Sequence, residues 1–223
     1  MARPAKFDDT GILDAAGAIV AARGVGAATV SAIGAAIGAP NGSIYHRFKT
    51  RDELLGRLWL QKARVFQDSF VEGLAHSDPY QAGLQGALSL PLTVRQDPAG
   101  ARIMMLYRRE DFVGGGWPPE MKREAARLGR QVRDALDDIT RRLFGCVTQT
   151  ARSTASFAVL HVPLAAVRQH VAANEAPPPL VDELIEAAYA AVVARGRNLC
   201  ADVEATPRGK RRPSGKSTDR DMR

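Results

Sequence analysis

The sequence is poor in aromatic residues, in cysteine and in runs of β-branched residues. Of its 223 residues, 6% are aromatic and two, Cys146 and Cys200, are cysteines. Two cysteines are too few for the disulfide framework of a small secreted domain, so we expect small buried or idle side chains in a reducing compartment. Alanine supplies most of the apolar share, and this favours helices over strands.

Long hydrophobic stretches are also missing. Asp8, Asp9 and Asp14 interrupt the apolar segment near the N-terminus, which therefore does not read as a signal peptide. Residues 24–40 carry no charge, but glycines interrupt them and the segment is too short and too weakly apolar to span a bilayer. We therefore expect a cytoplasmic protein that does not contact the membrane.

The formal net charge of +7 is unevenly distributed. Residues 207–223 contain seven Lys or Arg and two Asp, a local charge of 7 − 2 = +5, which leaves about +2 for the rest of the chain. Pro, Gly, Ser and basic residues replace apolar ones from Thr206 onwards, so we expect 206–223 to be a disordered basic tail. The tail is either a solvated end or an arm that adds non-specific affinity for phosphate.

What the sequence does contain is a succession of helix caps and helical stripes. Thr10, Thr29 and Thr50 are predicted N-caps, and Glu53 completes a capping box with Thr50. Pro91 is expected to end one helix and Pro163 to kink another. We predict an all-α protein of about nine helices with no strand.

One short segment, 38–55 (GAPNGSIYHRFKTRDELL), stands out because helix breakers precede a short aromatic and basic run. Gly38 supplies a permissive backbone angle, and Pro40 suits the first turn of a helix. Ile44 and Phe48 are four residues apart and are expected to pack inward. This pattern predicts a helix-turn-helix, whose second helix enters the major groove of DNA.

The segment 29–55, TVSAIGAAIGAPNGSIYHRFKTRDELL, resembles the N-terminal DNA-binding signature of TetR-family transcriptional regulators. The resemblance implies a three-helix DNA-binding domain at 1–50 and a helical effector-binding and dimerisation domain at 51–200. Short polar side chains at the start of the second helix can approach base edges, whereas aromatic and basic side chains suit phosphate. The DNA-binding residues expected from the pattern and the resemblance are Thr29, Pro40, Asn41, Gly42, Ser43, Tyr45, His46 and Lys49.

Two positions depart from the family pattern. A small or polar residue is common in the family where this chain has Pro40, and a basic residue is frequent where it has Asn41. These differences suggest an unusual base preference, and Asn41 has the chemistry to pair with adenine.

The resemblance also implies an effector pocket between helices and a homodimer. The pocket is expected among Trp59, Phe66, Phe70, Met104, Met105, Tyr107, Phe112 and Trp117, although aromatic residues at helical spacing also serve as ordinary core. The dimer interface is expected at Phe157, Leu160, Leu164, Val167, Leu184, Ala188, Ala191 and Val192. The partners implied are a palindromic double-stranded DNA operator, a second copy of the chain and a small, apolar effector.

Enzymatic chemistry has no support in the sequence. No phosphate-binding glycine loop, nucleophile elbow or paired carboxylates can be recognised, and the histidines lack partners at metal-ligand spacing. We therefore expect no catalytic residue, cofactor or metal. We interpret the sequence as that of a repressor that its effector releases from DNA. The alternatives are an architectural DNA-binding protein, an activator without an effector and a helical enzyme with the same fold.

Overall fold

The computed structural model describes residues 8–113 and 117–197. Within these two ranges the chain is helical and contains no strand. The predicted basic tail at 206–223 and Cys200 lie outside the described residues, as do residues 114–116.

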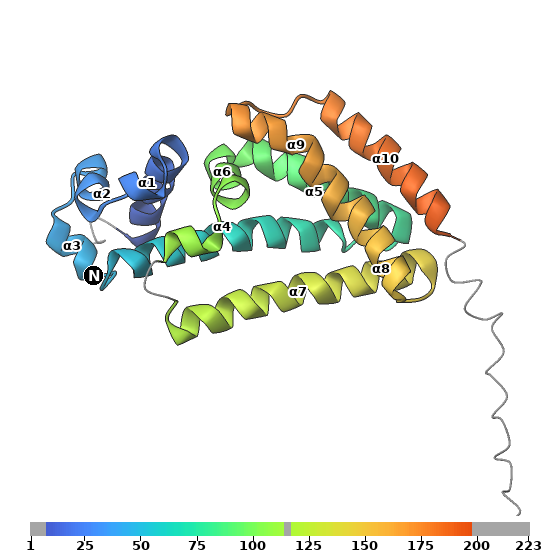
Figure 1. Ribbon diagram of the computed structural model, residues 1–223, viewed down its shortest axis with the longest axis horizontal. Coiled ribbons are helices and arrows are strands. Elements are labelled where there is room, and N and C mark those ends of the chain that lie inside the picture. The colour runs from blue at the N-terminus through green and yellow to red at the C-terminus, as the bar shows by residue number, and fades with distance from the viewer. Residues whose placement is uncertain (1–7, 114–116, 198–223) are drawn as a thin grey trace, which may run out of the picture.

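The chain forms a small helical end and a larger helical body (Figure 1). The elements at the small end are α1 (Asp9–Arg23), the 3₁₀ turn η1 (Val25–Ala27), α2 (Val30–Ile37) and α3 (Asn41–Tyr45). Those of the body are α4 (Arg51–Gly73), α5 (Pro79–Gln96), α6 (Pro98–Leu106), the 3₁₀ turn η2 (Arg109–Phe112), α7 (Pro119–Phe144), α8 (Gln149–Ser156), the π-helical turn η3 (Phe157–His161), α9 (Val162–Ala173) and α10 (Leu180–Gly196).

The prediction of about nine helices is confirmed. Ten α-helical segments are present in the described ranges, but α8, η3 and α9 follow one another without a break and form one long helix, which leaves 10 − 1 = 9. The π-helical turn explains the continuity. Pro163 has no N–H and its ring crowds the preceding turn, and the chain widens there, so that the Val162 N–H bonds to the Phe157 carbonyl five residues back.

Local capping chemistry sets most helix starts. The hydroxyl of Thr29 accepts a hydrogen bond from the Ala32 N–H, and that of Thr50 accepts one from the Glu53 N–H. Both predicted caps are thus confirmed. The predicted cap at Thr10 is wrong, because Asp8 caps α1 through the Gly11 N–H and places Thr10 inside the helix.

Two other expectations from the sequence are wrong. Pro91 does not end its helix but lies buried inside α5, where packing against neighbouring helices offsets the lost hydrogen bond. The cysteine expectation also fails, because Cys146 is disulfide-bonded rather than an idle thiol.

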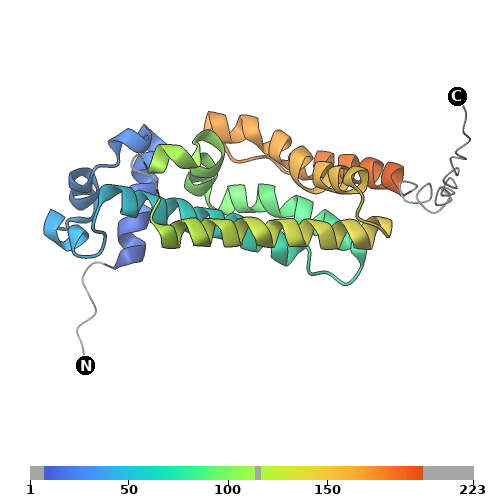
Figure 2. The ribbon, with the colours of Figure 1, turned by 60° about the horizontal axis from the view of Figure 1, so that its bottom comes forward.

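Two large clusters of buried side chains fill the molecule. The first joins α1–α3 to the first half of α4 and includes Ile12, Ile44 and Leu54. The second lies in the body and includes Phe70, Ile139 and Tyr189. Helices α4 and α7 lie side by side along the body (Figures 1 and 2). None of the helices in the described ranges is both long and apolar enough to cross a membrane.

Tyr189 is a tightly fitted part of the body core. Its side chain is fully buried, its hydroxyl donates to the Tyr80 carbonyl at 2.9 Å, and the two phenol rings meet edge to face at 5.1 Å. Burial raises the pKa of the Tyr189 phenol, so the group stays a neutral donor. Gly83 of α5 lies against this ring, and a Cβ atom there would overlap the hydroxyl.

We predict opposite effects for the same substitution at two helical glycines. Gly83→Ala should lower the free energy of unfolding by about 1–3 kcal/mol, because the new methyl group displaces a ring that the core holds. Gly129→Ala in α7 would contact only the flexible Arg133 side chain at 3.5 Å and should raise it by up to about 1 kcal/mol. Urea unfolding of both variants checks this; equal effects would contradict the packing at Tyr189.

Candidate nucleic-acid interface and internal cavity

The turn between α2 and α3 has the tight geometry that its residues predict. Gly38 adopts a left-handed conformation with φ 67°, and the Ala39 N–H bonds to the Gly34 carbonyl at 2.9 Å. Gly34 is required as well, because a Cβ there would lie 2.7 Å from the Ala39 carbonyl oxygen. Pro40 then precedes α3 as its N-cap residue.

The predicted DNA-binding residues lie at this end of the molecule (Figure 1). The side chain of Ser43 is half-buried, whereas the remaining seven residues are exposed: Thr29, Pro40, Asn41, Gly42, Tyr45, His46 and Lys49. Ile44 and Phe48 are buried in the first cluster, as expected, and hold α3 against α1 and α4. The packing of Ile44 and Phe48 therefore determines which side of α3 faces solvent. Contact of that side with DNA stays a prediction.

The charges around α3 favour an anionic partner. No carboxylate occurs between Asn41 and Lys49. The backbone N–H of Lys49 donates to Glu53 at 3.0 Å, while its ammonium has no ion-pair partner among the described residues. Sequence reasoning passed over Ser31, which is exposed in the first turn of α2 beside Thr29. Its position just after a helix cap was the available signal, since N–H groups there attract phosphate.

Two arginines that the sequence did not single out hold this end in place. Arg51, at the start of α4, donates to the carbonyls of Ala28 at 2.9 Å and Val25 at 2.5 Å. Arg102 of α6 donates to the Ala21 carbonyl of α1 at 3.0 Å and to the Val171 carbonyl of α9 at 2.9 Å. Both fix the orientation of α1–α3 on the body, and nothing local in the sequence reveals their distant partners.

A cavity of about 340 Å³ lies in the body and opens to solvent beside the exposed side chains of His161 and Leu164. It is lined by Phe66, Gln67 and Phe70 of α4, Gly86, Ser89 and Leu90 of α5, Met104 and Met105 of α6, Val132 of α7, and Val159, Leu160, His161 and Leu164 of the long helix α8–η3–α9. Its volume and mostly apolar lining are typical of sites for small molecules.

The structure brings only half of the predicted effector residues to this cavity. Phe66, Phe70, Met104 and Met105 line it. Gln67 was missed because a lone glutamine on a helix gives no signal of its own. Its carboxamide oxygen Oε1 is nevertheless buried without a hydrogen-bond partner.

The other four predicted effector residues pack elsewhere. Trp59 and Trp117 meet edge to face at 5.4 Å, and Tyr107 meets Phe112 in the same way at 6.4 Å. Phe112 is buried in the first cluster, where Tyr107 packs against it. None of these four side chains lines the cavity.

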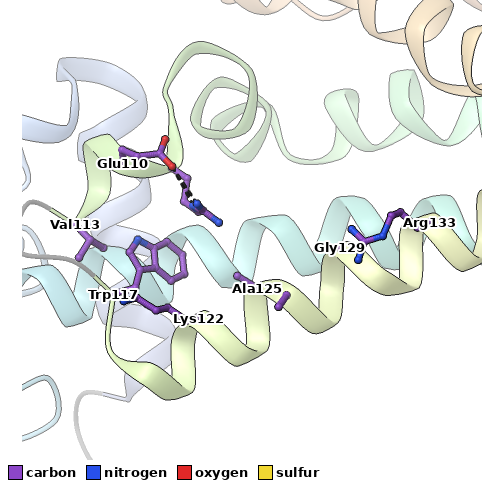
Figure 3. Close-up of a pocket in the computed structure, with 9 residues that line it drawn as sticks. Glu110, Val113, Trp117, Lys122, Ala125, Gly129 and Arg133 are labelled. Carbon is purple, nitrogen blue, oxygen red and sulfur yellow. Dashed lines mark hydrogen bonds and ion pairs between the residues drawn. The ribbon is translucent and has the colours of Figure 1, made fainter.

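Trp117 also borders an open groove of about 570 Å³ between η2 and α7. The groove follows α7 from Lys122 past Ala125 and Gly129 to Arg133 (Figure 3). Glu110 forms an ion pair with Arg109 at the edge of the groove. The pKa of the Glu110 carboxyl is lowered, chiefly by a hydrogen bond from its own backbone N–H and further by Arg109. Unlike the cavity, this groove has four exposed, charged side chains in its lining: Arg109, Glu110, Lys122 and Arg133.

The predicted dimer residues divide into exposed and buried sets. The side chains of Phe157, Leu164, Leu184 and Ala191 are exposed, and those of Leu160, Ala188 and Val192 are partly buried. Val167 is fully buried within its own chain, so its prediction as an interface residue is wrong. A proline-induced π-helical turn shifts the helix face by part of a turn, which a stripe with a strict helical period does not anticipate.

An exposed helix-turn-helix on an all-helical body defines a sequence-specific DNA-binding transcriptional regulator. Residues 12–58 match the family profile described as bacterial regulatory proteins, tetR family. The helix-turn-helix end of the chain is thus similar to that of TetR-family transcriptional regulators. A search among curated proteins gave no match.

Solved structures share the fold across most of the chain. FadR from Bacillus subtilis, in complex with stearoyl-CoA, has 17% identity and a TM-score of 0.63, covering 84% of this chain and 98% of that one. FadR from Bacillus halodurans has 18% identity and a TM-score of 0.62, with coverages of 83% and 98%. PfmR from Thermus thermophilus has 17% identity and a TM-score of 0.63, with coverages of 82% and 97%. Such identities establish the fold alone.

In the described part of the chain, no group of three or more His, Cys, Asp or Glu side chains is placed so that it could bind a metal ion.

Two substitutions in α3 and its flank should separate affinity from specificity. Lys49→Ala should weaken binding to all DNA sequences alike and lower the salt slope of log K by about 1, because it removes one phosphate contact. Asn41→Ala should cost about 1–3 kcal/mol on the preferred sequence only. Fluorescence anisotropy on specific and random duplexes measures both effects.

Arg130→Ala, which removes an exposed cation in the middle of α7, serves as the control and should leave both affinities unchanged. A loss of affinity in this control equal to that of Lys49→Ala would mean that general charge, rather than the helix-turn-helix, governs binding.

Proposed function

We propose that the protein is a homodimeric repressor that reads a palindromic DNA operator and leaves it when a small effector fills the internal cavity. The observation that carries this proposal is the course of α4. Its first half lies in the cluster that supports the helix-turn-helix, through Leu54 and Leu55, and its second half lines the cavity through Phe66 and Phe70. One rigid helix therefore touches both sites.

Helix α6 makes a second connection between the two sites. Ile103 is buried in the first cluster, while Met104 and Met105 line the cavity. Arg102 joins the same helix to α1. An effector that displaces the methionines or the aromatic rings of α4 would shift both helices relative to α1, and with them the reading helix.

Dimerisation is supported by apolar side chains that the chain leaves in solvent on its C-terminal helices. Phe157, Leu164 and Leu184 are each about half exposed, at 50%, 45% and 58%. A palindromic site requires two reading helices about 34–36 Å apart, which a single chain does not provide. A second copy packed against α8–α10 would cover these side chains and set that distance.

The cavity supports an effector that is mainly apolar, as its lining by Phe, Met, Leu and Val indicates. The similar FadR structure contains stearoyl-CoA, and we propose that this chain also responds to a molecule with a hydrocarbon portion. The regulator acts by binding alone, in the cytoplasm where its DNA lies. The domain limits 1–50 and 51–200 remain part of this proposal.

Release from DNA has a thermodynamic condition. The effector must bind the released conformation more tightly than the operator-bound one, and the operator must then weaken effector binding by the same factor. Equal effector affinity with and without operator would exclude this mechanism while leaving DNA recognition intact.

We predict that a charge on the exposed face of α10 prevents dimerisation. Leu184→Glu places a carboxylate where the partner's apolar side chains would pack, so the variant should elute as a monomer and bind a palindrome with at least about tenfold lower affinity. Light scattering coupled to size exclusion measures the mass. Val65→Glu is the matched control, since Val65 is 44% exposed on α4 and should leave the dimer unchanged.

Sequence-specific recognition has its own test. DNA from upstream of the protein's own gene should bind at least about a thousandfold more tightly than random DNA of equal length, a difference of roughly 4 kcal/mol. Anisotropy at two salt concentrations separates this gap from the general affinity for phosphate. Equal, steeply salt-dependent binding of both duplexes would favour an architectural DNA-binding protein or an operator elsewhere.

A further inference from the structure

The internal cavity differs from its surroundings in that no charged side chain lines it. Its lining contains no Asp, Glu, Lys or Arg, whereas the groove beside Trp117 contains several. An ionised group that enters an apolar site without a partner loses its hydration and gains little in return. The apolar part of the lining, away from His161 at the open rim, therefore disfavours carboxylates, phosphates and ammonium groups.

The polar side chains of the lining are few, and their positions differ. The Ser89 hydroxyl donates to the Gly86 carbonyl at 2.7 Å within α5. His161 lies exposed at the rim, with its ring against Phe157 at 6.3 Å. Gln67 lies between Phe66 and Phe70 along α4, and its Oε1 is buried without a partner.

A carboxamide oxygen that is buried without a hydrogen-bond partner is energetically costly. The carboxamide oxygen Oε1 is an acceptor, so the group that can bond to it is a hydrogen-bond donor on a molecule in the cavity. A ligand that donates a hydrogen bond to Oε1 supplies the partner that this buried oxygen lacks. Gln67 is thus the lining residue best suited to select a head group.

We propose that Gln67 anchors the polar head of a neutral amphiphile, a molecule with a hydrocarbon body and one uncharged hydrogen-bond donor such as a hydroxyl. The assignment rests on the proposed function only in taking this cavity as the effector site. The hydrocarbon body would lie among Phe66, Phe70, Met104 and Met105. Since Gln67 lies on α4, occupation of this site acts directly on the helix that enters the DNA-binding end.

The test uses the full chain and three probes of nearly equal size: decan-1-ol, methyl nonyl ether and decanoate. In calorimetric titration without DNA, decan-1-ol should bind about tenfold more tightly than the ether, the factor that one buried neutral hydrogen bond supplies. Decanoate should bind about a hundredfold more weakly than the alcohol, because its charge finds no partner. Equal affinities for the three probes, or no binding of decan-1-ol, would overturn the proposal.

Variants then assign the head group to its residue. Gln67→Leu should reduce the alcohol to the affinity of the ether and leave the ether unchanged; Gln67→Met does the same with an unbranched side chain if the leucine variant unfolds. Gln61→Leu is the matched control, since Gln61 also lies on α4 with a buried, unpartnered Oε1 but does not line the cavity. It should retain the full preference for the alcohol.

Two further outcomes are informative. Loss of the preference in His161→Ala with Gln67→Leu unaffected would assign the head group to the rim and refute the role of Gln67. Binding of decan-1-ol through Gln67 with no effect on DNA affinity would uphold the ligand class and refute the effector-driven release instead.

Discussion

The arrangement of the molecule depends on α4 belonging to two hydrophobic cores at once. Leu54, Leu55 and Leu58 are fully buried with the helices of the DNA-binding end, and Phe70 is buried in the body. A helix of 23 residues extends about 35 Å at 1.5 Å per residue, so one rigid element spans both parts. A flexible linker would keep each part folded but would transmit nothing between them.

Polar contacts fix the angle at which α4 carries the DNA-binding end. Arg51 and Arg102 direct their guanidinium groups at backbone carbonyls near helix ends, where the last carbonyls have no partner within the helix. Lys62 and Asp97 join α4 to the start of α6 at 3.0 Å. These bonds lie at the junction between the two parts of the molecule and, with the shared cluster, set their relative orientation.

The same large side chains serve two purposes in this fold, and position decides which. Trp59 and Phe112 fill the core beside the DNA-binding end, whereas Phe66 and Phe70 border a space that the surrounding helices do not fill. All four were predicted to meet an effector, because helical spacing shows which side of a helix is apolar. Spacing does not show whether the opposing helix supplies enough volume to fill the gap.

The helices, most of their caps and the helix-turn-helix follow from local sequence, because Thr29, Gly38 and Thr50 act on backbone groups within four residues of themselves. Three features could not be predicted locally: Pro91 stays inside a helix, Val167 faces inward, and Gln67, unlike Gln61, borders a cavity. Each of these outcomes depends on packing between segments far apart in the chain. Burial and partner geometry arise only when those segments meet, and no local pattern contains them.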